Sequence, residues 1–401
     1  MTPASKRAPC GEKQLLVCCA RTRLTPEGAD KVRGIVAGPL DWDYLLWEAE
    51  ENSITPLLER HLSAIAPGAA PPAAQEQLKR TSRANTVRCL YLTAELIHIL
   101  RLFESREIPS IPYKGPVLAA QAYGDIALRE FEDLDIILRQ SDLPNAHEVI
   151  SSLGYKPKYD WILSPGASAS LVPGEYNYRD EARRAMVELH TEITLRHFPV
   201  KPDLDDFMRK RAPVRVGERD VLTFAAEDSL PMLCIHGSKD FWERLSWIAD
   251  VSELIRSHPA LDWDRVARLA ESLHATRMLH VGLALAALVI GAPLLPEVAA
   301  RVSADRVAGQ LAVEVHERLM SRPFQTLDAV GRLQFRRRMV AGYFDGWRYT
   351  LRLAVVPSED DWQLVRLPHA LAPLYVALRP LRLLQKYGRA GRRPNTEIKR
   401  T

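Results

Sequence analysis

The stretch from Pro112 to Leu138 constrains the fold more than any other part of the chain. Apolar residues run into Lys114-Gly115, where a glycine allows the backbone to turn sharply. Pro116 suits the first turn of a helix, because the N–H that proline lacks would be unpaired there anyway. A second apolar segment, DLDIIL, ends the stretch and alternates as a strand does. The order predicts a strand, a tight turn, a short helix and a second strand.

Two acidic residues stand near the start of the second predicted strand. Period-two geometry puts Asp133 and Asp135 on one face and Leu134, Ile136 and Leu138 on the other. Neighbouring carboxylates repel each other, and a hard divalent cation such as Mg²⁺ relieves that repulsion while leaving coordination positions for phosphate oxygens. The alternative is a solvated strand end, because aspartates spaced in this way are common by chance.

Two further segments extend this candidate site. The N–H groups of Val117 and Leu118, at the start of the predicted helix, offer a seat for a phosphate. Residues 185–192 alternate as a later strand, with Glu188 and His190 on one face. A third carboxylate is what a two-metal phosphoryl-transfer site needs. His190 is interpreted either as a structural histidine or as a group that orients Glu188 or contacts substrate.

These residues resemble the pattern of a bacterial branch of uncharacterised nucleotidyltransferases within the DNA polymerase β-like superfamily. The matching residues are Lys114-Gly115, Tyr123, Arg129, Asp133-Leu134-Asp135 and Val187-Glu188-Leu189-His190, followed by a second signature of His236, Lys239, Trp247 and Asp250. The superfamily more often has Gly-Ser in place of Lys114-Gly115, and the branch more often has Asp in place of Glu188. The resemblance extends from about residue 41 to about residue 388.

The resemblance implies an α+β fold in which a small mixed-sheet nucleotidyltransferase core is flanked by N-terminal and C-terminal helical domains. It implies that Asp133, Asp135 and Glu188 are catalytic and bind Mg²⁺. It also implies transfer of an NMP, AMP by default, from an NTP to a small-molecule, peptide or protein acceptor, with release of pyrophosphate. The nucleotide-binding residues would be Lys114, Gly115, Arg129 and Lys239. His190 and His236 would orient the residues of the site without binding the metal themselves.

The second signature has a structural interpretation as well. His236 and Lys239 share a helix face, so Lys239 could reach the β- and γ-phosphates across a cleft. In the alternative, His236, Trp247 and Asp250 form a packed polar cluster that holds a helical domain together. Arg129 likewise is either a phosphate contact or a surface arginine.

The chain divides by pattern into five segments. Residues 1–38 are expected to form a flexible extension, 39–106 an N-terminal helical region, 107–225 the α/β core, 226–385 a C-terminal helical domain and 386–401 a basic flexible tail. The longest apolar run, Val281 to Pro296, is too short for a membrane span, which needs roughly 20 residues, and is expected to be a buried helix.

Composition limits the remaining function classes. A net charge of +4 over 401 residues gives no indication of nucleic-acid binding. The five cysteines have no metal-binding spacing and are expected to be reduced thiols of a cytoplasmic protein without a membrane span. Oligomeric state is not predicted. Two alternatives to NMP transfer remain open, a non-catalytic nucleotide-binding or structural partner in a biosynthetic complex and a kinase-like transfer of phosphate.

Overall fold

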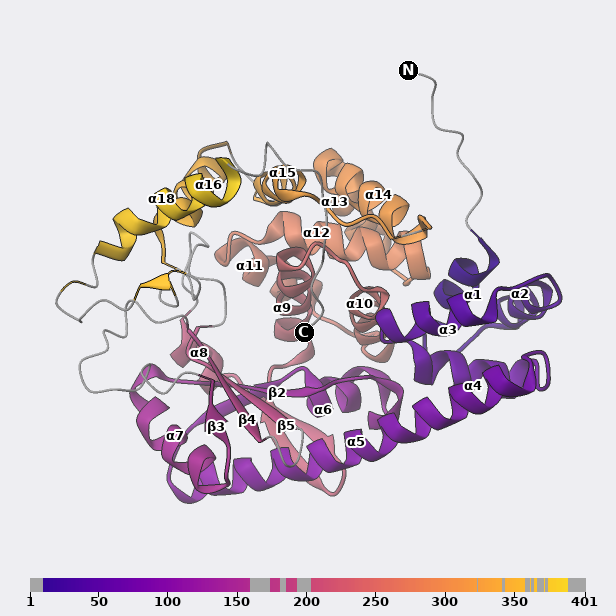
Figure 1. Cartoon of the computed structure of the whole chain (residues 1–401), viewed down its shortest axis with the longest axis horizontal. Helices are drawn as coiled ribbons and strands as arrows, with labels where there is room; N and C mark the ends of the chain where they lie inside the picture. Colours follow the sequence, from indigo (N-terminus) through magenta and orange to yellow (C-terminus); the bar gives the residue numbers. More distant parts are fainter. Residues whose placement is uncertain are drawn as a thin grey trace.

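The computed structural model describes residues 10–158, 174–180, 185–192, 203–322, 324–340, 343–357, 361, 364–365, 371 and 374–388. The described part of the chain is an α+β protein with a small mixed sheet and flanking helices, as the sequence predicted. Figure 1 shows the sheet beside the long helix α5, with the helices of the second half of the chain arching over the opposite side.

The sheet has five strands in the order β1-β2-β5-β4-β3. Strands β2 and β5 are parallel, whereas β1 pairs with β2, β4 with β5 and β3 with β4 in antiparallel register. Strands β6 and β7 form a separate hairpin that the sequence analysis did not anticipate. The strands are β1 (Ser110–Tyr113), β2 (Asp133–Leu138), β3 (Lys156–Pro157), β4 (Glu175–Asp180), β5 (Ala185–His190), β6 (Ala212–Val216) and β7 (Arg219–Thr223).

The two faces of the sheet pack differently. Leu134, Ile136, Val187 and Leu189 belong to a core shared with helices α5 (Pro72–Ser105) and α7 (Leu143–Ser152). The opposite face carries the acidic residues and borders a larger core built mainly from helices. Alternation along β2 therefore separates an apolar face from a polar face, as period-two geometry requires.

The N-terminal residues differ from the expected flexible extension. Residues 11–36 form helices α1 and α2, with Leu15 and Cys19 fully buried. Lys13 and Glu48 form a buried ion pair of 2.5 Å that joins α1 to α3. The extension was predicted because residues 1–38 have no clear pattern and Lys13 and Arg21 crowd a short apolar run. The surface against which these helices pack comes from later helices. These helices are α1 (Gly11–Cys19), α2 (Pro26–Val36), α3 (Trp42–Glu51) and α4 (Thr55–Ile65).

Capping explains where several of these helices begin. Asp41 accepts a hydrogen bond from the N–H of Tyr44 at 3.1 Å, as expected of an N-cap residue. Helix α5 begins at Pro72 and runs to Ser105, at the end of the region 39–106 that was expected to be helical. The N-terminal helices share one hydrophobic core with the C-terminal helices. The predicted helical segments before and after the sheet therefore pack as one body.

The C-terminal half is helical, as predicted. Within the apolar run from Val281, Leu283 and Leu285 are buried and the helix ends at Ile290, before Gly291. No helix in the described part of the chain combines the length and the apolar character needed to cross a membrane. The helices are α9 (Ala226–Lys239), α10 (Leu245–Ser257), α11 (Trp263–Ser272), α12 (Thr276–Leu285), η5 (Ala286–Ile290), α13 (Pro296–Ala304), α14 (Arg306–Met320), α15 (Ala329–Met339), α16 (Tyr343–Val355) and α18 (Tyr375–Gly388).

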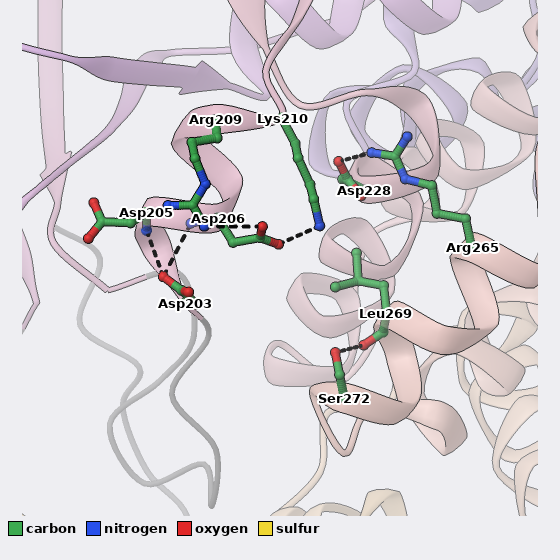
Figure 2. Close-up of polar contacts among 9 residues, drawn as sticks. All are labelled: Asp203, Asp205, Asp206, Arg209, Lys210, Asp228, Arg265, Leu269 and Ser272. Carbon is green, nitrogen blue, oxygen red and sulfur yellow. Dashed lines mark hydrogen bonds and ion pairs between the residues drawn. The ribbon is translucent and has the colours of Figure 1, made fainter.

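Polar contacts stabilise two helix starts in the segment that follows the sheet. Asp203 caps the short helix α8 (Leu204–Arg209), and Asp206 pairs with Lys210 at 2.6 Å (Figure 2). Nearby, Arg265 of α11 donates to Asp228 in the first turn of α9 at 2.6 Å. The second contact anchors the start of α9, the helix whose other end approaches the acidic face of the sheet.

Candidate functional site

Two neighbouring parallel strands bring the acidic residues together. Asp135 of β2 is the direct register partner of Glu188 of β5, and Asp133 is the partner of Met186. Partners on adjacent strands point to the same face, so Glu188 faces the same side as the aspartate pair. The arrangement predicted from the two separate sequence segments is therefore the one that the backbone provides.

A histidine joins this cluster. Nε2 of His190 lies 3.0 Å from Oδ1 of Asp135 and 3.6 Å from Oε2 of Glu188. Ligand atoms of Asp135, Glu188 and His190 all lie within 4.8 Å of one another. Asp133 stands on the same face but outside this group. The structure thus gathers two of the three predicted metal ligands with the histidine that the sequence analysis had placed behind them.

The carboxylates of the cluster differ in their electrostatic surroundings. Burial opposes ionisation of Asp135, but Lys114 and His190 outweigh it and hold the pKa of this carboxyl well below its usual range. Burial raises the pKa of Asp133, and the negative charge of Asp135 adds to that effect. Burial, followed by the charges of Asp135 and Glu175, raises the pKa of Glu188 to about 7. The cluster therefore holds one firmly ionised carboxylate and two that resist ionisation.

The turn between β1 and helix α6 (Gly115–Leu118) positions a lysine beside the cluster. Lys114 has a φ of 57°, a conformation rare for residues with a side chain, and its Nζ lies 3.8 Å from Oδ1 of Asp135. Gly115 has a φ of 40°, and a Cβ there would meet the carbonyl oxygen of Asp133 at 3.3 Å. Glycine therefore lets the helix start approach the aspartate strand closely.

One detail of the predicted phosphate seat is wrong. The N–H of Leu118 donates to the carbonyl oxygen of Lys114 at 2.9 Å, so it is not free for a phosphate. The helix is also short, since α6 passes directly into the π-helical turn η1 (Ala119–Tyr123). Lys114 is the group at this turn that offers a charge to a ligand.

Helices α9 and α10 carry the second signature, and α9 brings His236 and Lys239 to the site. His236 contacts Trp247 edge to face, with ring centroids 5.3 Å apart, and its Nδ1 lies 3.5 Å from Oδ2 of Asp240. Burial, together with the charges of Lys114 and Lys239, holds the pKa of His236 well below its usual value, so the ring is neutral. Nζ of Lys239 lies 4.0 Å from Oε2 of Glu175, an ion pair that spans from α9 to the sheet.

Arg129 lies in a buried cluster of its own. Its Nε and Nη2 donate to the two carboxylate oxygens of Asp250 at 2.8 and 3.0 Å, and the hydroxyl of Tyr123 donates to Asp250 at 2.8 Å. Burial opposes the charged guanidinium, but Asp250 outweighs burial and raises the pKa of Arg129. The same side chains that matched the sequence pattern thus join the loop before β2 to helix α10.

Strand β4 adds two residues that the sequence analysis missed. Asn177 is the register partner of Glu188, and Glu175 is the partner of His190. Oδ1 of Asn177 is buried, and no hydrogen-bond partner for it is found among the described residues. The alternation Glu-Tyr-Asn-Tyr was the available signal, because it puts both polar residues on one face and both tyrosines on the other.

The donor atoms present suit a divalent cation. Two carboxylates and an imidazole lie within reach of one another, and the unpaired amide oxygen of Asn177 stands beside Glu188 in register. Buried polar atoms are normally hydrogen-bonded, so an unpaired acceptor in an acidic cluster indicates a site that a ligand completes. Asp135, Glu188 and His190 are the residues that could hold the ion, with Asp133 alongside.

Comparison with known proteins agrees with the residue pattern. No curated protein matches the chain. A protein family described as "Uncharacterised nucleotidyltransferase" matches residues 38–291, more than half of the chain and the whole of the sheet with its acidic strands. The chain therefore belongs to this family of nucleotidyltransferases, which are transferases of phosphorus-containing groups.

Proposed function

We propose that the protein transfers an NMP, AMP by default, from an NTP to a hydroxyl of a small-molecule, peptide or protein acceptor, and that pyrophosphate leaves. The observation that carries this proposal is the register of Asp135 with Glu188 on parallel strands, with Asp133 on the same face. Three carboxylates on one face are the ligand set that metal-assisted phosphoryl transfer uses.

Asp133, Asp135 and Glu188 are proposed to hold Mg²⁺. A cation bound there would neutralise charge on the triphosphate and lower the pKa of a bound hydroxyl. Lys114 and His190 outweigh burial and hold the pKa of Asp135 below its usual range, which favours the ionised carboxylate that a cation binds. Nε2 of His190 stands 3.0 Å from Oδ1 of Asp135, beside the proposed ion.

Glu188 is proposed to accept the proton of the acceptor hydroxyl. Its pKa of about 7 lies near neutral pH, where a group can both exist as a base and hold the proton it receives. Asn177, next to Glu188 in register, would accept a hydrogen bond from the acceptor or from the ribose. Lys114, beside Asp135, and Lys239, beside Glu175, would bind the β- and γ-phosphates.

The test is transfer of label from NTPs that carry ³²P at the α position, compared with NTPs labelled at the γ position. Transfer of α-label, with release of pyrophosphate, is expected and should be lost in Asp133→Ala and Asp135→Asn. Glu132→Gln is the matched control, because Glu132 directly precedes Asp133 but is exposed and paired with Arg88 at 3.0 Å. Transfer of γ-label would mean a kinase, and Mg-ATP binding without transfer of either label would mean a nucleotide sensor.

A further inference from the structure

An imidazole lies among the carboxylates that were expected to hold the metal. His190 is 7% exposed, and its Nε2 faces Asp135 and Glu188 together rather than either one alone. Asp133, the third predicted ligand, is not part of the tight group of ligand atoms. The most compact set of donors in the described part of the chain is therefore two carboxylates and one nitrogen.

The separations within this set match those of ligands around one ion. Metal–ligand bonds of about 2.1 Å place two ligands about 3.0 Å apart at a right angle and about 3.4 Å apart at a tetrahedral angle. His190 Nε2 lies 3.0 Å from Asp135 Oδ1 and 3.6 Å from Glu188 Oε2. The two distances from His190 are thus close to those between neighbouring ligands of one ion, and all three ligand atoms lie within 4.8 Å of one another.

A hydrogen bond from His190 to Asp135 explains the shorter distance but not the whole arrangement. It leaves Glu188 against Asp135 without a compensating charge, because Lys114 lies 3.8 Å from Asp135 and no ion pair of a described lysine or arginine reaches Glu188. The unpaired oxygen of Asn177 adds a fourth donor beside Glu188. All four groups would be satisfied if they surrounded one cation.

We propose that Nε2 of His190 is a direct ligand of the ion held by Asp135 and Glu188, and that this ion binds before the nucleotide. Imidazole binds first-row transition ions more strongly than Mg²⁺, so the site should prefer Mn²⁺. Asp133 is then left, with Asp135, for a second ion that arrives with the phosphates. The order of binding and the second ion rest on the proposed function, whereas the ligation by His190 does not.

Electron paramagnetic resonance of Mn²⁺ tests the ligation on the whole protein without any nucleotide. One Mn²⁺ per chain is expected to bind, and pulsed spectra should show coupling to a directly bound ¹⁴N nucleus. Protein grown with ¹⁵N-labelled histidine should show ¹⁵N coupling instead, a result that depends on no substitution. Wild-type protein with bound Mn²⁺ and no histidine coupling would overturn the proposal.

Two variants identify which histidine is bound. His190→Gln is expected to lose the nitrogen coupling and to weaken Mn²⁺ binding at least about tenfold. Its affinity for Mg²⁺, measured by competition, should fall less. His236→Gln is the matched control, because His236 also lies near Asp135 but outside the group of ligand atoms, and it should keep the coupling. Coupling that persists in His190→Gln and disappears in His236→Gln would overturn the assignment.

The result is separable from the label-transfer test. If His190 binds no metal but α-label transfer still requires Asp135, this inference is wrong and the proposed function stands. If the histidine coupling is present and no NTP gives label transfer, the ion site is real and the proposed function is wrong. A failure of Mn²⁺ to bind at all would overturn the inference directly.

Discussion

Two buried aspartates on the same side of the sheet have opposite surroundings. Asp250, 2% exposed, accepts hydrogen bonds from Arg129 and Tyr123, and the guanidinium of Arg129 balances its negative charge. Asp135, 5% exposed, has one imidazole at 3.0 Å and one lysine at 3.8 Å, and two other carboxylates share its face. The first is satisfied by the protein itself, whereas the second is held in a cluster with excess negative charge.

The difference distinguishes buried charges that stabilise the fold from buried charges that await a ligand. A buried charge whose partners are complete stabilises a particular arrangement of elements, here the loop before β2 against α10. A cluster of buried carboxylates without enough positive charge is costly to the folded state, and such strain is typical of sites completed by a ligand. Both clusters matched the sequence pattern, so the pattern alone did not distinguish them.

The largest expected effect is on activity, at Asp135. Replacing Asp135 with Asn keeps the shape and removes the charge, so label transfer should fall about a thousandfold or more. The free energy of unfolding of the metal-free protein should fall less than in Asp250→Ala, because the lost attraction of Lys114 and His190 for the carboxylate is partly offset by the relief of its repulsion with Glu188. Label transfer and urea denaturation in EDTA measure the two quantities. A variant that is much less stable would mean that Asp135 is as structural as Asp250.

The opposite outcome is expected at Asp250. Asp250→Ala leaves the guanidinium of Arg129 buried without its partner, so the free energy of unfolding should fall by about 3 kcal/mol or more. Urea denaturation measures the loss, and Arg129→Met combined with Asp250→Leu should recover most of it. If Asp250→Ala is stable and only nucleotide affinity changes, Arg129 contacts the nucleotide, as the resemblance implied.

Sequence reasoning succeeded where the relevant geometry is local. Alternation along Asp133–Leu138 fixed which residues share a face, and the same rule placed Glu188 on the face it occupies. It did not reveal that Arg129 pairs with a carboxylate 121 residues away, because spacing along a chain carries no information about such partners.

Other misses have related causes. The burial of α1 depends on later helices, and the place of Asn177 beside Glu188 depends on how β4 pairs. His190 matched the family pattern but was given a supporting position, because a histidine on a strand is more often structural than a ligand. The side-chain distances in the structure show that its ring nitrogen lies within 3.6 Å of two of those carboxylates.

The third expected effect is a dependence of stability on pH. The pKa of Glu188 is about 7 in the folded protein and near 4.5 when exposed, so the folded state binds the proton more tightly. Its contribution to stability is therefore complete below pH 4.5 and is lost as the pH rises through 7. The loss should be about 2 to 3 kcal/mol in the metal-free protein.

Unfolding in EDTA at pH 5 and pH 8 measures this loss, and Glu188→Gln should remove it. Glu130, whose pKa burial also raises to about 7, gives a slope of the same sign. The relevant quantity is therefore the difference between variant and wild type in how the free energy of unfolding changes from pH 5 to pH 8. Glu130→Gln is the matched control, because it should change the slope without changing Mn²⁺ binding. An unchanged slope in Glu188→Gln would mean that the cluster is not strained by its own charge.

The smallest expected effect is at Lys239, which has an ion-pair partner within the protein and is also proposed to bind phosphate. Its 4.0 Å pair with Glu175 is about one-third exposed on both sides, so breaking the pair should cost less than about 1 kcal/mol of stability. If Lys239 binds the triphosphate, Lys239→Ala should raise KM for the NTP about tenfold and change kcat little. Glu175→Gln frees the lysine from its partner and should lower KM instead. KM should shift in opposite directions in the two variants, because Glu175 competes with phosphate for the ammonium group of Lys239. Shifts of KM in the same direction would mean that Lys239, like Arg129, has a structural role.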